Sequence, residues 1–143
     1  MLLRNQQIKN ANIEFVTAEF MNTLNQLVAM GVTPVIFSPP PANGTHLGRC
    51  LAKAQWNGIT LDACNFKMSD MSQSRKDVYS FLESVAAKHR VIRLDALICD
   101  ENMCKTHLDT TWIFRDKGHL SHEGSAKLGI KHNFYQLLSE KAR

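Results

Sequence analysis

Long amphipathic segments alternate with short apolar ones along this chain, and few folds accommodate that order. Apolar side chains recur at steps of three and four in the first such segment, which predicts a helix over residues 11–30 with Gly31 as its cap. Residues 32–37 are mainly apolar or β-branched and lead into Ser38-Pro39-Pro40-Pro41. They predict a buried strand that ends in a loop.

The same alternation continues in the second half of the chain. Residues 42–68 show no clear period and predict a long irregular segment with a short helix near residues 51–55. A second helix is predicted to open at Ser69-Asp70 and to end near residue 90, followed by a strand over residues 91–94. A strand-like segment over residues 111–114 then precedes a last helix with Ser121 as its N-cap.

This order predicts an α/β domain built on a parallel sheet with helices on both faces. Functional residues in such folds gather at the carboxyl ends of the strands, where Ser38, Asp95 and Asp116 are expected. A length of 143 residues fits one domain, and the sequence has neither an apolar run of membrane-helix length nor a secretory signal at its start. The net charge of +4 comes from scattered basic residues, which indicates a solvated surface and no nucleic-acid partner.

The most informative motif is the segment from Asp116 to Ser125, which enters the last helix. An Asp and a His three residues apart can pair, so that Asp116 orients one nitrogen of the His119 imidazole while the other nitrogen faces a cleft. That arrangement is what a general base for a serine nucleophile requires. By itself the spacing is also common among surface residues, so the surrounding sequence must decide.

The string Asp116-x-x-His119-Leu120-Ser121-x-x-Gly124-Ser125 resembles the last conserved block of SGNH hydrolases. It is most similar to the version appended to acyltransferase-3 membrane proteins, which O-acylate bacterial surface polysaccharides. The segments 31–41, 49–52 and 97–104 agree with this resemblance. It implies a three-layer SGNH/flavodoxin-like fold in which His119 is the general base and Asp116 its orienting carboxylate.

The serine that this resemblance calls for has no counterpart, because the chain contains no Gly-Asp-Ser block. Residues 1–143 are therefore expected to form a single, truncated domain that lacks the N-terminal strand or strands of the sheet. Such a chain should have little or no esterase activity alone, and its exposed sheet edge could form a homodimer. For the parent protein, the resemblance implies an acyltransferase-3 membrane domain, the periplasmic side of the inner membrane, and a glycan or acyl-ester substrate.

The four cysteines bracket two loops, which suits two disulfides in an oxidising compartment. Three connectivities are possible, and Cys50–Cys64 with Cys99–Cys104 is favoured because the second bond then closes a tight loop. Four reduced, partly buried thiols are the alternative.

Two other function classes remain open from the sequence. Cys99 and Cys104 followed by His119 and His122 come near a Cys2His2 zinc pattern, although the spacing between the histidines is too short. A non-catalytic remnant that keeps a glycan-binding cleft is the other, and the missing serine favours it. Ser38 and His46 are candidate cleft residues, and serine acyl transfer requires neither a metal nor an organic cofactor.

Overall fold

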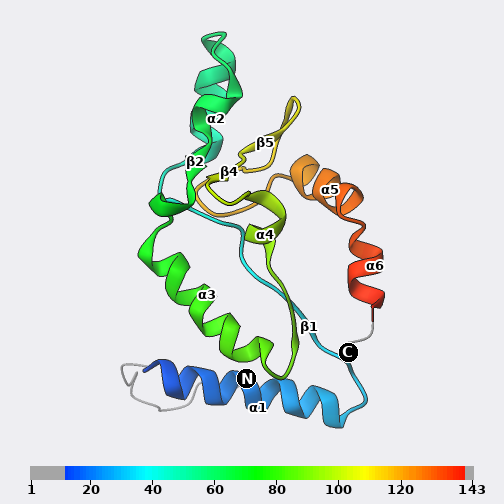
Figure 1. Ribbon diagram of the computed structural model, residues 1–143. Helices are drawn as coiled ribbons and strands as arrows, with labels where there is room; N and C mark the ends of the chain where they lie inside the picture. The colour runs from blue at the N-terminus through cyan, green and yellow to red at the C-terminus, as the bar shows by residue number, and fades with distance from the viewer. Residues whose placement is uncertain (1–11, 141–143) are drawn as a thin grey trace, which may run out of the picture.

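The computed structural model describes residues 12–140, which form a mixed α/β arrangement with small sheets (Figure 1). The helices are α1 (Ile13–Ala29), α2 (Leu47–Trp56), α3 (Gln73–Ala86), α4 (Leu94–Ile98), α5 (His122–Lys131) and α6 (Phe134–Ser139), with 3-10 turns η1 (Leu61–Cys64) and η2 (Met68–Asp70). The strands are β1 (Val35–Phe37), β2 (Phe66–Lys67), β3 (Arg90–Ile92), β4 (Met103–Cys104), β5 (His107–Leu108) and β6 (Thr111–Trp112). None of the helices within residues 12–140 is long and apolar enough to cross a bilayer.

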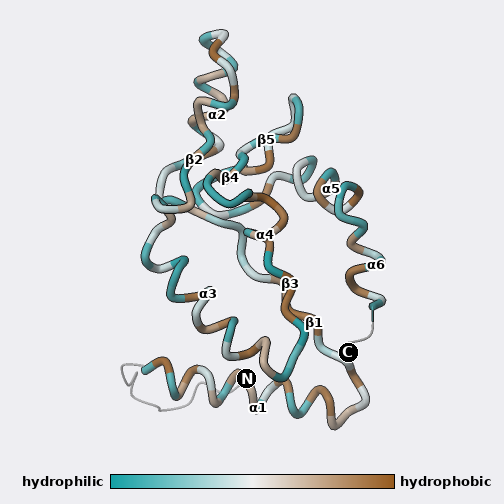
Figure 2. The backbone as a smooth tube through the Cα atoms, viewed as in Figure 1, coloured by the Kyte–Doolittle hydropathy of each residue, from teal (hydrophilic) through white to brown (hydrophobic). Residues whose placement is uncertain are grey.

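The two longer strands, β1 and β3, pair in parallel through the middle of the molecule (Figure 1). Their register places Ile36 opposite Val91, and the pairing extends to Ser38, whose N–H donates to Ile92 O at 2.9 Å. Figure 2 shows that β3 and α4, in the middle of the molecule, contain hydrophobic stretches. These apolar residues therefore build the parallel pair that the alternating sequence predicts.

Helices contact this parallel pair through alternate strand residues. Ile36 and Val91 pack with the buried residues of α3, among them Tyr79 and Leu82. Phe37, which follows Ile36 and points the opposite way, lies with its ring centroid 5.4 Å from that of Phe134 in α6. Figure 1 accordingly shows α3 and α6 on different sides of β1.

Within residues 12–140 the parallel sheet has two strands, and the other strands form antiparallel pairs, β2 with β4 and β5 with β6. The strand-like segment predicted over residues 111–114 thus belongs to a hairpin and ends at Trp112. The main core lies where these pairs meet α4 and α5. Its buried residues are Leu47, Phe66, Leu94, Ile98, Cys104, Ile113, Phe114 and Leu128.

The first helix matches the prediction, whereas the first strand covers only the last three of the six predicted residues and is half-buried. The second helix does not begin where predicted. Residues 68–70 form η2, and α3 begins one turn later with Ser72 as its N-cap. The N–H of Ser72 donates to Ala42 O at 2.9 Å, which ties the helix start to the loop after β1. Ser69 as the start of this helix was therefore wrong, because a tertiary contact sets the boundary.

The last predicted helix is divided in two. Asn133 adopts a left-handed conformation with φ of 47°, which ends α5, and its side chain accepts from the N–H of Gln136 to cap α6. Leu128 is fully buried, whereas Tyr135 is 83% exposed. The two helices therefore do not present one continuous buried face.

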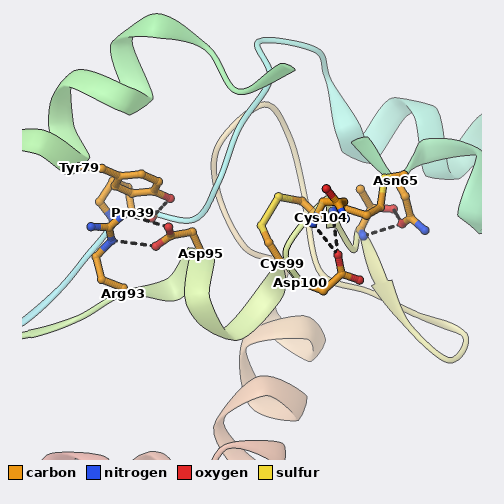
Figure 3. Close-up of a disulfide and its surroundings, with 11 residues drawn as sticks. Pro39, Asn65, Tyr79, Arg93, Asp95, Cys99, Asp100 and Cys104 are labelled. Atoms are coloured by element: carbon orange, nitrogen blue, oxygen red, sulfur yellow. Dashed lines mark hydrogen bonds and ion pairs between the residues drawn. A yellow bond between two sulfur atoms is a disulfide. The ribbon is translucent and has the colours of Figure 1, made fainter. Parts of the chain in front are cut away.

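Both disulfides have the pairing favoured from the sequence. Cys50–Cys64 links α2 to η1, and Cys99–Cys104 joins the end of α4 to β4 (Figure 3). Between the latter cysteines, the Asp100 carboxylate accepts from the N–H groups of Asn102 and Met103 at 3.0 and 2.8 Å. The local hydrogen bonds and the disulfide therefore close the same tight loop.

Candidate active site

The Asp116–His119 loop is a compact turn that closes on itself. Phe114 and Leu120 form an isolated antiparallel bridge at its base, and the Arg115 N–H donates to His119 O at 2.9 Å. At its tip, Asp116 Oδ1 accepts from the N–H groups of Gly118 and His119 at 3.0 and 2.9 Å. An Asp carboxylate that bonds the backbone two and three residues ahead is a typical turn-forming device. The motif therefore organises its own loop.

The same carboxylate holds the His119 imidazole. Nδ1 of His119 lies 2.9 Å from Asp116 Oδ1 and 3.0 Å from Oδ2. An ionised carboxylate only accepts, so this contact places the proton of a neutral imidazole on Nδ1 and leaves Nε2 as an acceptor. The His119 side chain is 72% exposed, so Nε2 is accessible from solvent. The pair has the form of an orienting acid and a general base.

Asp116 is held in its ionised form. The N–H of Gly118, supported by the side chain and N–H of His119, keeps the pKa of this carboxyl well below its usual range, and desolvation opposes them only in part. The Arg115 guanidinium adds an exposed ion pair at 3.4 Å. Asp116 therefore remains an acceptor for His119 even where an ordinary carboxyl, with a pKa of about 3.9, becomes protonated.

Two glycines allow helices to approach the backbone on either side of this loop. A Cβ at Gly48, in the first turn of α2, would lie 1.9 Å from Arg115 O. A Cβ at Gly124, in α5, would lie 2.6 Å from both Ile113 Cα and Trp112 O. The close contact of α2 with Arg115 and of α5 with residues 112–113 therefore requires glycine at both positions.

Replacing Gly48 with Ala is expected to lower the free energy of unfolding by about 3 kcal/mol, because the new methyl group overlaps backbone that cannot move independently. Gly129 is the matched control, since a Cβ there would meet Phe134 Cδ2 at an ordinary 3.6 Å. Gly129→Ala should be neutral or stabilise by up to about 1 kcal/mol through helix propensity. Urea unfolding measures both changes, and equal effects would show that the Gly48 contact is not tight.

The loop faces an open depression of about 550 Å³. His46, Asp116, Lys117 and His119 line it together with Gly118. His46 Nδ1 also accepts from the Arg49 N–H at 3.1 Å, which caps α2 and fixes the direction of the ring. The structure thus brings the candidate cleft residue His46 to the same surface as the Asp–His pair.

Ser38, the other candidate cleft residue, does not line this depression. It is 2% exposed, its Oγ accepts from the Leu94 N–H at 2.8 Å, and its hydroxyl donates to Pro39 O at 3.0 Å. These bonds connect the end of β1 to the start of α4. Ser38 therefore has a structural position between the two strand ends.

The residues that form the opposite wall of the depression were not identified from the sequence. Ser72, Ser74 and Arg75, from the N-terminal end of α3, line it opposite the Asp–His loop. The sequence prediction started this helix at Ser69, about one turn too early. It therefore did not show that these three side chains lie on the same wall. The serine at position 72, which suits an N-cap, was the available signal.

No hydroxyl within residues 12–140 is hydrogen-bonded to His119 Nε2, so the described part of the chain contains the Asp116–His119 pair without a hydroxyl in contact with it. The zinc alternative is wrong, because Cys99 and Cys104 are bonded to each other and cannot serve as thiolate ligands. The group of residues 116–119 can orient a base and accept a proton.

A comparison with solved structures finds the periplasmic domain of a lipopolysaccharide acetyltransferase from Salmonella ser. Paratyphi A, with a TM-score of 0.60 and 14% sequence identity. The match covers 87% of this chain and 49% of the other, so this chain spans about half the length of that domain. At this identity the likeness shows the fold alone. A search of curated proteins gives no match.

The family model of the SGNH domain fused to AT3 domains matches residues 3–130. That span includes both strands of the parallel pair, the Asp116–His119 loop and most of α5. The resemblance seen in the sequence is therefore confirmed, and the chain belongs to the family of SGNH domains that are fused to AT3 domains.

Proposed function

We propose that this chain is the C-terminal part of an SGNH-type acyltransferase or esterase that acts on O-acyl groups of a bacterial surface polysaccharide. The observation that carries the proposal is the contact of His119 Nδ1 with both oxygens of Asp116, in a loop that faces an open depression. Membership of the AT3-fused SGNH family and the lipopolysaccharide acetyltransferase neighbour support acyl chemistry on a glycan.

In this mechanism a serine hydroxyl attacks the carbonyl carbon of an acyl ester while His119 Nε2 takes the hydroxyl proton. Asp116 stabilises the imidazolium that forms, because its carboxylate already contacts the protonated Nδ1. The tetrahedral intermediate then expels the alcohol, to which His119 returns the proton, and an acyl-serine remains. Attack on that acyl-serine by a sugar hydroxyl gives a transferase, and attack by water gives an esterase.

The serine in this proposal comes from a segment that precedes these 143 residues in the parent protein, since no Gly-Asp-Ser block occurs in the chain. The same segment would add strands beside β1 and β3 and so complete a three-layer sheet. Two observations support this: β1 and β3 pair only with each other within residues 12–140, and the chain spans about half of its structural neighbour. In the isolated chain, a second copy would cover the open edge.

We place the parent protein at the periplasmic side of the inner membrane, next to an AT3 membrane domain. The two disulfides support an oxidising compartment, and the structural neighbour is itself a periplasmic domain. The proposed mechanism uses no metal or organic cofactor.

The 143-residue chain should hydrolyse p-nitrophenyl acetate no faster than the His119→Ala variant does, because an oriented base without its nucleophile lacks the covalent route. Release of p-nitrophenol measures the rate, and His122→Ala serves as a control for an exposed imidazole of the same loop region. Hydrolysis that is lost with His119→Ala and kept with His122→Ala would contradict the proposed external serine. If the intact parent also lacks turnover but binds glycan, the non-catalytic remnant is favoured.

A further inference from the structure

The depression beside the Asp–His pair has a basic wall. Arg75 lines it from the first turn of α3 and Lys117 lines it from the loop. The Arg75 guanidinium lies directly against that loop, because its Nη2 is 3.0 Å from the place that a Cβ would take at Gly118. Lys117 thus belongs to the same loop as His119, and the Arg75 guanidinium contacts that loop.

Among residues 12–140, no carboxylate forms an ion pair with either of these two cations. Asp116 is the acidic residue of the lining, and its oxygens are occupied by His119 Nδ1, two backbone N–H groups and Arg115. Within residues 12–140, neither Arg75 nor Lys117 forms an ion pair, whereas Arg90, Arg93 and Lys127 each have a carboxylate partner. The depression therefore carries excess positive charge next to the proposed base.

Hydrogen-bond donors on the same wall add to this charge. The hydroxyls of Ser72 and Ser74 lie 3.4 Å apart, and Ser72 Oγ does not cap α3, so both hydroxyls can bond a ligand. A guanidinium with adjacent hydroxyl donors suits an oxygen anion with several acceptor positions, such as a carboxylate or a phosphate.

We propose that this depression recognises an anionic group, a carboxylate or a phosphate, on the glycan that the enzyme acylates or deacylates. Arg75 binds the oxyanion and Lys117 adds a second positive charge, which places a neighbouring sugar hydroxyl or ester at His119. The substrate class is thus an acidic glycan. This inference rests on the proposed function, because it concerns the substrate of the same site.

Binding of defined saccharides to the full 143-residue chain tests the proposal without requiring turnover. Two pairs of probes are titrated by isothermal calorimetry: trigalacturonate with its neutral counterpart galactotriose, and galactose 6-phosphate with its neutral counterpart galactose. Trigalacturonate should bind at least about tenfold more tightly than galactotriose, since hydrogen bonds to charged groups are stronger than neutral ones. Tighter binding of galactose 6-phosphate than of galactose also supports the proposal. If trigalacturonate then binds no more tightly than galactotriose, the recognised group is a phosphate and not a carboxylate.

Matched charge removals identify the residues. Arg75→Gln and Lys117→Gln should each reduce the preference for the anionic saccharide, and the double variant should abolish it. Lys53→Gln removes the same charge from α2, outside the lining of the depression, and should leave the preference intact. Higher salt should weaken the binding of anionic saccharides to the unmodified chain and leave the binding of neutral saccharides unchanged. This test does not depend on the folding of any variant.

Equal affinity for anionic and neutral saccharides, no binding of any anionic probe, or a preference that survives the double variant would overturn the inference. The result for His119→Ala separates this inference from the proposed function. That variant should keep the anionic preference and lose turnover in the intact parent. If the chain prefers anionic saccharides but the intact parent shows no turnover that depends on His119, the proposed binding site is supported and the proposed catalytic function is contradicted.

Discussion

Replacing Asp116 with Asn is expected to lower kcat of the intact enzyme by about 10,000-fold, the loss typical of a triad whose orienting acid becomes an amide. The amide oxygen can still accept from the N–H groups of Gly118 and His119, so the loop keeps its turn. The amide nitrogen would then face His119 Nδ1 and donate to it. His119 would accept that bond at Nδ1 and carry its proton on Nε2, where it cannot act as a base.

Two measurements on the Asp116→Asn variant separate chemistry from folding. Acyl-transfer kinetics give the change in kcat, and ¹⁵N NMR of the 143-residue chain reports which imidazole nitrogen of His119 is protonated. Asp109→Asn is the control, because the Asp109 side chain is 89% exposed and, within residues 12–140, its carboxylate pairs only with Lys127. If kcat falls by less than about tenfold while the tautomer changes, the His119 base does not control the rate.

Replacing Asp95 with Asn is expected to lower the free energy of unfolding by about 3 kcal/mol, because it removes a largely buried carboxylate that pairs with the Arg93 guanidinium through two hydrogen bonds. Arg93 Nε and Nη2 each lie 2.9 Å from one oxygen of Asp95, whose side chain is 10% exposed (Figure 3). The guanidinium also lies 4.2 Å from the centre of the Tyr79 ring. Tyr79 in turn donates to Pro39 O at 3.0 Å, so this cluster connects α3 with the residues after β1 and β3.

Glu83→Gln is the matched control for this substitution. Glu83 pairs with the same guanidinium at 3.5 Å, but its side chain is 71% exposed, so its loss should cost below about 0.5 kcal/mol. Urea unfolding of both variants gives the comparison. Similar costs for Glu83→Gln and Asp95→Asn would mean that burial does not strengthen the Arg93–Asp95 pair.

Local pattern was sufficient for the elements that depend on their own residues. The spacing of apolar side chains located α1, and the apolar run before the prolines located β1. Ser121 caps α5 as predicted, accepting from the Gly124 N–H at 2.8 Å. The Asp116–His119 contact was also predictable, because a turn of four residues brings these side chains together without help from the rest of the fold.

Features set by contacts between distant segments could not be predicted. The start of α3 depends on a bond from Ser72 to Ala42, and the depression depends on Arg75 meeting Gly118, 43 positions further along the chain. Ser38 was expected at a cleft because it follows a strand, yet its hydroxyl is used by the N–H of Leu94. Sequence spacing identifies side chains that could react. It does not show which of them are already hydrogen-bonded to backbone groups from distant parts of the chain.

The measurement that tests the central claim most directly is labelling with a fluorophosphonate, which reacts with serines activated by a neighbouring base. The claim is that the Asp116–His119 pair activates a serine outside these 143 residues. We expect no serine of the 143-residue chain to be labelled. In the intact parent, a serine of the preceding segment should be labelled, at a rate that falls at least about 100-fold with His119→Ala. Labelling of a serine within residues 1–143, or labelling of the parent that does not depend on His119, would contradict the claim.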